Sequence, residues 1–239
     1  TVVRQPVVTR AHTEEMLLAC GADLNVSGDG LVVRLRPSTL EPFELDVPGD
    51  PSQAAFWIVA ACIVPGSDVT VEGVYIGPAR TGFLDVLTRM GADVERVGDR
   101  SIRARYSPDL HGTDVNGGEV ADVIDEIPAL AMAAAVADGG TRFADAGELR
   151  VKESDRIDAI ASALNGLGAR VETVDDGFAV QGGAHLRGGH GHSRGDHRIA
   201  MALAVAGLAA EGTTTVEGWE AVATSYPGFG RDLEQLCGS

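Results

Sequence analysis

The sequence predicts an α/β fold in which three βαβαββ repeats surround buried central helices. Three stretches, 54–64, 127–137 and 199–210, are apolar on every side, and an aspartate precedes each of them. A helix that is apolar all round belongs in a protein core. The tetrapeptide Gly-Ala-Asp-Val at 91–94 also recurs as Gly-Ala-Arg-Val at 168–171, each time after an amphipathic stretch. Repeated strands and helices of this kind are typical of α/β domains, so we expect the repeats to share one helical core.

Residues 1–46 come before the repeats and read as a partial unit. The pattern of apolar residues predicts a strand at the start, a helix over about 13–20, and strands at 24–26 and 31–35. Residues 47–239 then form the body of the protein, with repeats over about 47–108, 113–182 and 184–239.

The first repeat opens with Asp50-Pro51-Ser52-Gln53, where an aspartate N-cap followed by proline predicts a helix start. The apolar run comes next, followed by a strand at 69–71. Thr81 is the predicted N-cap of an amphipathic helix, whose buried face contains Leu84, Leu87 and Met90. Strands near 94–97 and 101–106 complete the repeat.

The second and third repeats follow the same order. Asp125 opens the second buried helix, and Ser154 is the expected N-cap of an amphipathic helix that ends at Gly168. A strand at 178–180 closes this repeat. In the third repeat, Asp196 opens the buried helix, a strand follows at 213–216, and the last helix covers 228–236. We expect this repeat to have the full βαβαββ order as well.

Composition limits the class of partner. The 239 residues carry a formal net charge of −16, so a nucleic acid or an anionic membrane surface is not an expected partner. Three widely spaced cysteines, Cys20, Cys62 and Cys237, fit reduced thiols in the cytoplasm. We expect no transmembrane segment, because the apolar runs are short or interrupted. The chain opens mid-pattern without methionine, which indicates a fragment.

One short segment combines several charged residues with a helix start. Lys152, Glu153 and Arg156 crowd the N-terminus of the second amphipathic helix, where free N–H groups already favour an anion. Two cations four residues apart at this end of a helix are locally unfavourable. Such local misfits are expected at functional sites. A solvated, charged turn is the alternative.

The internal symmetry of the repeats indicates where these residues meet. Equivalent helix ends can converge on one face, which would bring Asp125, Arg198 and the 152–156 cluster to one pocket. That pocket would hold an acid able to take a proton and bases able to bind anionic groups. Buried ion pairs between the repeats are the alternative explanation.

The histidines of the third repeat could suggest a metal site. His185, His190, His192 and His197 lie around a glycine-rich stretch, and a His-x-His spacing can bind zinc. No cysteine or acid completes a convincing ligand set. We therefore expect a mobile loop around Gly188-Gly189 and no metal.

Several motifs resemble those of the 5-enolpyruvylshikimate-3-phosphate synthase family (3-phosphoshikimate 1-carboxyvinyltransferase), and the resemblance covers essentially the whole chain. The motifs are 150–156 (Arg-Val-Lys-Glu-Ser-Asp-Arg), 195–201 (Gly-Asp-His-Arg-Ile-Ala-Met), 48–56, 80–82 and 124–128. The resemblance implies an enolpyruvyl-transferase-type lobe of three repeats. Residues 1–46 would then be the last part of the N-terminal lobe and 47–239 the C-terminal lobe. The rest of the N-terminal lobe would be the partner that completes the site.

The family transfers the enolpyruvyl group of phosphoenolpyruvate to the 5-hydroxyl of shikimate 3-phosphate, without a metal or organic cofactor. The resemblance implies that Asp125 is the base, that Glu153 donates or relays a proton to the methylene carbon, and that Lys152 contacts the hydroxyl. Arg156 and Arg198 would hold the phosphoenolpyruvate carboxylate, a task that suits planar guanidinium groups.

The other substrate contacts that the resemblance implies rest on a looser match to the family's motifs. His197 joins the substrate-binding set beside Arg198, and Thr9, Arg10 and His12 fall where the other lobe touches shikimate 3-phosphate. Glyphosate is the implied inhibitor. Ala11 and Thr224 depart from the family pattern, which often has aspartate and lysine at these places.

Two other functions are compatible with the motifs. A UDP-N-acetylglucosamine enolpyruvyl transferase would share the fold, although the 150–156 and 195–201 motifs favour the shikimate enzyme. A non-catalytic, repeat-built module that binds anions is the second. Because the expected first-lobe signatures are absent from the sequence, we expect the isolated chain to be catalytically inactive.

Overall fold

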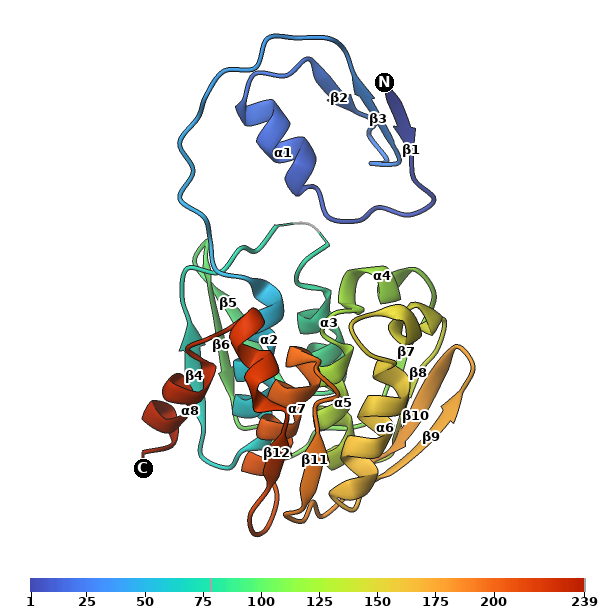
Figure 1. The fold of residues 1–239 in the computed structure, drawn as a ribbon, viewed down its shortest axis with the longest axis vertical. Helices are drawn as coiled ribbons and strands as arrows, with labels where there is room; N and C mark the ends of the chain where they lie inside the picture. Colours follow the sequence, from blue (N-terminus) through green and yellow to red (C-terminus); the bar gives the residue numbers. More distant parts are fainter. Residues whose placement is uncertain (78, 239) are drawn as a thin grey trace.

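A computed structural model describes residues 1–77 and 79–238 (Figure 1). A small N-terminal unit lies above a much larger body, and an extended link over 36–48 joins them along one side (Figure 1). The small unit consists of β1 (Val2–Arg4), α1 (His12–Ala19), β2 (Leu24–Val26) and β3 (Val32–Leu35). The predicted elements of this segment are therefore present, within one or two residues.

The small unit has almost no hydrophobic core. Its strands form an antiparallel sheet in the order β1-β3-β2, and α1 has no buried residue. Ala22 is its one buried apolar residue, whereas Val2, Val3, Met16 and Leu18 are at least half exposed. Burial of apolar surface is the main stabilising term in folding, so this unit has little to stabilise it on its own.

The first repeat of the large body has the two predicted helices and three of its strands, but residues 47–77 contain no leading strand before α2. Its elements are α2 (Pro51–Ile63), β4 (Asp68–Val71), α3 (Gly82–Arg89), β5 (Asp93–Val97) and β6 (Ser101–Arg105). The three strands are antiparallel in the order β4-β6-β5. Gly49 forms a single parallel bridge with Val74, just after β4, in the place where the leading strand of a full repeat is expected.

The second repeat has the same topology with additional short helices. It comprises β7 (Asp114–Val115), η1 (Gly117–Glu119), α4 (Val120–Val123), α5 (Ile127–Val136), β8 (Gly140–Phe143), η2 (Gly147–Val151), α6 (Arg156–Gly166), β9 (Arg170–Val174) and β10 (Gly177–Gln181). The sheet order is β7-β8-β10-β9, with β7 parallel to β8 and the other pairs antiparallel. The β8-β10-β9 portion matches β4-β6-β5, which supports the predicted repeat.

The third repeat is shorter than predicted. It contains β11 (His190–His192), α7 (His197–Leu208), β12 (Thr215–Glu217), η3 (Trp219–Thr224) and α8 (Phe229–Cys237). Strands β11 and β12 pair in parallel, but residues 184–238 contain no closing antiparallel pair. The prediction of a full βαβαββ order for this repeat is therefore wrong.

Gly188 and Gly189 form a short irregular segment between the bridge of Arg187 with Glu211 and strand β11, which begins at His190. A Cβ on Gly188 would lie 2.3 Å from the Thr213 carbonyl oxygen, and one on Gly191 would lie 2.4 Å from the Leu203 side chain. Only glycine allows the backbone this close approach. The glycines therefore serve packing here, which the composition of the segment did not reveal.

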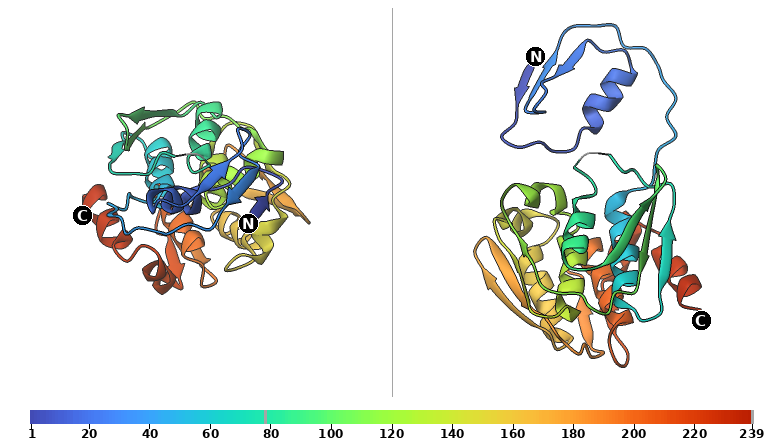
Figure 2. Two further views of the ribbon diagram at one scale, coloured as in Figure 1. Left: turned by 90° about the horizontal axis from the view of Figure 1, so that it is seen from above. Right: turned by 180° about the vertical axis from the view of Figure 1, so that it is seen from behind.

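Helices α2, α5 and α7 form the core, as their uniformly apolar sequences predict. Nearly every residue of α2 and α5 is buried, and α7 is buried along most of its length. Seen from above, the small unit covers the ends of these helices (Figure 2). No helix within residues 1–77 and 79–238 is long and apolar enough to cross a membrane.

Candidate active site

The N-terminal ends of the three central helices converge below the small unit. Asp50 caps α2 by accepting a hydrogen bond from the Ser52 N–H at 2.9 Å, and Asp196 caps α7 by accepting one from the Arg198 N–H at 2.9 Å. Asp125, which opens the second buried helix in the sequence, does not cap α5. Instead it lies between α4 and α5, and Glu126 takes the N-cap position without a side-chain bond. The Asp125 carboxylate is thereby available for other partners.

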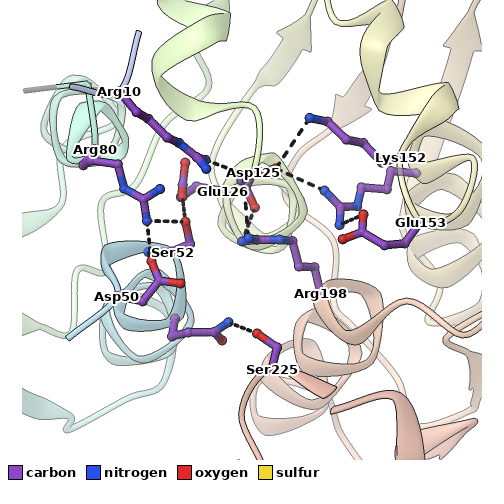
Figure 3. Close-up of polar contacts among 12 residues, drawn as sticks. Arg10, Asp50, Ser52, Arg80, Asp125, Glu126, Lys152, Glu153, Arg198 and Ser225 are labelled. Atoms are coloured by element: carbon purple, nitrogen blue, oxygen red, sulfur yellow. Dashed lines mark hydrogen bonds and ion pairs between the residues drawn. The ribbon is translucent and has the colours of Figure 1, made fainter. Parts of the chain in front are cut away.

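Four cations surround Asp125 (Figure 3). Arg10 from the small unit donates a hydrogen bond to Oδ2, and the buried Arg156 donates one to Oδ1 at 3.3 Å. The Lys152 Nζ lies 3.9 Å from Oδ1. Arg198 Nη2 lies 3.7 Å from Oδ2, and its Nη1 donates to the Asp125 carbonyl at 3.0 Å. The charged side chains that were predicted to meet are therefore brought together, from four separate segments.

These cations control the protonation of Asp125. Burial acts to raise the pKa of the carboxyl group, but the charge of Arg198, the hydrogen bond and charge of Arg10, and the charge of Lys152 outweigh it and lower the pKa to about 2. Asp125 is therefore a stable carboxylate at neutral pH and, in this arrangement, a weak base.

Arg156 is fully buried and ties two repeats together. Its Nε donates to Asp196 Oδ2 at 2.8 Å, its Nη2 to Glu153 Oε2 at 2.5 Å, and Nη1 reaches Asp125. Hydrogen bonds from Arg156 lower the pKa of Asp196 against the effect of burial. The crowding of cations predicted at this helix end is thus balanced by carboxylates, and the buried ion pairs considered as an alternative are part of the same cluster.

The start of α6 differs from the prediction. Asp155, not Ser154, is the N-cap, and its carboxylate accepts a hydrogen bond from the Asp158 N–H at 3.2 Å. The Ser154 hydroxyl instead donates to Asp196 Oδ2 at 3.1 Å. Serine and aspartate are similarly good N-caps, so a neighbour from another repeat decides which of them is used.

Lys152 and Glu153 are the accessible members of the cluster. Lys152 is 23% exposed and forms an ion pair with Glu148 at 2.6 Å, while the Glu153 side chain is 49% exposed. Lys152 is also the only lysine in the sequence. An acid and an amine of opposite charge thus face the space beside Asp125, where they could contact a bound molecule.

Arg198 and His197 complete this side of the site. The buried Arg198 Nε lacks a hydrogen-bond partner within residues 1–77 and 79–238. His197 is half-buried, and burial together with the Arg198 charge lowers its pKa, which favours the neutral imidazole. A buried N–H without a partner is costly, so the Arg198 guanidinium is suited to accept an anionic ligand.

The remaining predicted site residues lie on the small unit, and only Arg10 contacts Asp125. Thr9 donates a long hydrogen bond of 3.4 Å to Gln5. His12 packs edge-on against Tyr75, with ring centroids 4.7 Å apart, and lies 3.8 Å from Glu15. It lines a cavity of about 450 Å³ between α1 and the start of α2.

The sequence assigned no role to a series of buried hydrogen bonds that lies next to Asp125. Arg80 donates to both Asp50 and Ser52, and the Ser52 hydroxyl donates to Glu126 (Figure 3). Ser52 and Glu126 are almost completely buried. Arg80 and Ser52 belong to motifs noted above, but only the fold shows that their side chains meet.

The pKa of Glu126 is shifted in the opposite direction to that of Asp125. Burial raises its pKa, although the Ser52 hydrogen bond and the Arg198 charge oppose this. The pKa of Glu126 is thus higher in the folded protein than in the unfolded chain. Protonated Glu126 therefore stabilises the fold fully below the unfolded value near 4.5, and this stabilisation is lost as the pH rises.

We therefore expect Glu126→Gln to raise the free energy of unfolding at pH 7.5 by about 1 kcal/mol. Glutamine Oε1 can still accept the Ser52 hydrogen bond without carrying a buried charge. Urea unfolding at pH 4.5 and 7.5 measures the effect, with the exposed Glu172→Gln as a control. A variant that is less stable than the unchanged chain at pH 7.5 contradicts the prediction.

Residues 1–233 match a protein-family model described as EPSP synthase (3-phosphoshikimate 1-carboxyvinyltransferase). The chain belongs to this family. A 3-phosphoshikimate 1-carboxyvinyltransferase of Pelotomaculum thermopropionicum is 50% identical over 238 residues, which are 96% of this chain and 54% of the relative. One of Herpetosiphon aurantiacus is 48% identical over 242 residues, with 96% and 56% covered.

Solved EPSP synthase structures have the same fold. One from Acinetobacter baumannii superposes with a TM-score of 0.88 at 39% identity, covering 98% of this chain and 56% of that one. The enolpyruvyl transferase NikO from Streptomyces tendae gives 0.80 at 24% identity, which concerns the fold alone. The chain thus spans about half the length of its EPSP synthase relatives.

Proposed function

We propose that this chain provides one half of the active site of an enzyme that transfers the enolpyruvyl group of phosphoenolpyruvate to the 5-hydroxyl of shikimate 3-phosphate. The observation that carries the proposal is the Asp125 carboxylate among four cations, at the convergent ends of the buried helices. The names of the relatives favour a shikimate substrate over UDP-N-acetylglucosamine. The other half of the site would come from the rest of the first lobe.

Anion binding follows from the local charge. The protein as a whole is strongly acidic, with a net charge of −16, so phosphates and carboxylates are repelled except near a basic cluster. Arg10, Lys152 and Arg198 form such a cluster and retain accessible or unpartnered N–H groups. We place the anionic groups of both substrates against it, with Thr9, His12 and His197 as further contacts.

Asp125 would orient and activate the substrate hydroxyl. Its low pKa makes it a poor base while Arg10 remains bonded to it. A substrate hydroxyl that takes the place of Arg10 removes one hydrogen bond and moves one positive charge away, and both changes raise the basicity of the carboxylate. Substrate binding and activation of the base are thereby coupled.

Glu153 and Arg156 would act together on phosphoenolpyruvate. Arg156 is saturated by carboxylates, and Glu153 is the most exposed of them. The substrate carboxylate can replace Glu153 on the guanidinium, and the released Glu153 then takes up a proton from solvent. It gives this proton to the methylene carbon as the hydroxyl oxygen adds to the neighbouring carbon and the hydroxyl proton passes to Asp125. Phosphate then leaves, and loss of a proton from the new methyl group restores the double bond.

The compartment that we propose for the reaction is the cytoplasm. The substrates are small, charged metabolites, and all three cysteines are free thiols, which favours the cytoplasm. Glyphosate, an anion, would compete for the same basic cluster.

A chimera in which the part of the first lobe of the Pelotomaculum relative that precedes the matching region is joined to residues 1–239 tests the function. We expect it to release phosphate from phosphoenolpyruvate only when shikimate 3-phosphate is present, and we expect the 239-residue chain alone to release none. Steady turnover by the isolated chain contradicts the half-site assignment. A folded chimera that neither turns over nor binds the substrates favours a non-catalytic anion-binding module.

A further inference from the structure

The segment that carries Lys152 and Glu153 has little regular structure of its own. Helix η2 is a short 3₁₀ helix over Gly147–Val151, and residues 152–154 form bends before α6 starts. Leu149 is buried in the core and anchors η2, whereas Val151 is 79% exposed, so apolar packing contributes little beyond Leu149. Short 3₁₀ segments have poor hydrogen-bond geometry, and the position of this loop must therefore depend on side-chain contacts.

The Arg150 side chain supplies these contacts. Its Nε donates to the Asp175 carbonyl at 2.8 Å and its Nη2 to the Val174 carbonyl at 2.7 Å. On the other side, Nη1 donates to Asp155 Oδ2 at 2.7 Å and to Asp158 Oδ1 at 3.2 Å. The guanidinium thus joins the β9–β10 turn to the first turn of α6.

Both sides of this connection are fixed by the fold. The turn carbonyls belong to a hairpin whose strands pair over five residues, and Asp155 is the N-cap that starts α6. The backbone adds one further bond, from the Ala146 N–H to the Asp176 carbonyl at 2.7 Å. Three donor nitrogens in a rigid plane are needed to reach all these acceptors, which lysine cannot provide.

We propose that Arg150 is a positioning residue that holds Lys152 and Glu153 in place for the reaction. The inference rests on the function proposed above. Arg150 itself donates away from the Asp125 cluster, to the hairpin and to α6, while the two residues that follow Val151 point into the cluster (Figure 3). A misplacement of about 1 Å in such groups can cost about 10²-fold in rate.

The single lysine allows a direct test in the 239-residue chain. Incorporation of ¹³C-lysine gives one Cε–Hε correlation signal, from Lys152 alone. We expect a dispersed signal with two distinct Hε protons in the unchanged chain, because the ammonium is held by Glu148 and Asp125. In Arg150→Ala and Arg150→Lys, the signal should move to the position of a freely rotating lysine.

Arg105→Ala is the matched control. Arg105 is 31% exposed against 28% for Arg150, and it also binds two carboxylates, at 2.9 and 2.6 Å, on the far sheet. The Trp57 and Trp219 indole signals report whether each variant keeps its fold. Unchanged lysine signals in folded Arg150→Ala and Arg150→Lys, or the same change in Arg105→Ala, overturn the proposal.

Kinetics of the chimera separate this proposal from the function on which it rests. Arg150→Ala should lower kcat by about 10²-fold with a smaller change in KM. In the unchanged chain, shikimate 3-phosphate with phosphoenolpyruvate should shift the lysine signal. If the Arg150 variants move the lysine signal but a folded, unchanged chimera does not turn over, the proposed function fails and Arg150 keeps only a role in positioning the loop. If substrates shift the lysine signal and Arg150→Ala leaves kcat intact, the positioning role fails.

Discussion

Replacing Arg156 with methionine should lower the free energy of unfolding by about 3–5 kcal/mol at neutral pH. The side chain is 1% exposed and its partner Asp196 is completely buried, so the substitution leaves an uncompensated carboxylate in the core. Glu153 and Asp125 lose a partner as well. Guanidinium unfolding followed by circular dichroism at pH 7 measures the loss.

Two further variants identify the cause. Arg103→Met removes an arginine whose ion pair with Asp68 lies on the surface, and it should have little effect. Adding Asp196→Asn to Arg156→Met keeps an N-cap for α7 but removes the buried charge, so part of the lost stability should return. A loss below about 1 kcal/mol for Arg156→Met would mean that the carboxylates are solvated and that the cluster is not a buried network.

The central helices could be predicted from the sequence because their signal is local. A run that is apolar on all sides has no exposed face, whichever way the helix turns. The N-cap of α2 was likewise predictable, since Asp50 and Pro51 both favour a helix start at the same place. Burial and termination of these elements depend on residues that are neighbours in the chain.

The errors concern contacts between distant segments. Ser154 is an adequate cap by itself, but its hydroxyl is used by Asp196, 42 residues away. Asp125 has a local sequence like that of the two capping aspartates, yet cations from elsewhere hold its carboxylate. The Ser52–Glu126 hydrogen bond joins residues 74 apart. No pattern within one segment contains such information, and only the folded arrangement of the repeats supplies it.

The repeat symmetry made it predictable that the ends of the central helices would meet at one site. It did not make predictable which charged side chains would form ion pairs there. The repeats indicated that Asp125, Arg156 and Arg198 would meet. The resemblance to the family implies that Arg156 binds the substrate carboxylate, whereas only the structure shows that its guanidinium is paired with Asp196, Glu153 and Asp125. A count of charged residues says little about which of them are free, because pairing depends on distances of a few ångströms.

Asp125→Asn should abolish most of the activity of the chimera, lowering kcat by about 10²–10⁴-fold. Asparagine preserves the shape of the side chain but cannot take the hydroxyl proton. The control is Asp122→Asn, three residues earlier on α4, where burial and the nearby Asp85 raise the pKa instead. That variant should leave kcat unchanged, and an equal loss of kcat in both variants would indicate a general effect on the loop.

The same pair of variants should respond to pH in opposite directions. The folded pKa of Asp125, about 2, lies below its unfolded value of 3.8. Its ionisation therefore contributes about 2 kcal/mol of stability above pH 4, and this is lost as the pH falls toward 2. Asp125→Asn removes that contribution, so its stability should fall less steeply with acid. Asp122→Asn removes a carboxyl group that favours the folded state at low pH, so its stability relative to the unchanged chain should rise with pH. The contrast arises because Arg198, Arg10 and Lys152 stabilise the Asp125 carboxylate, whereas burial and the nearby Asp85 disfavour the charged form of Asp122.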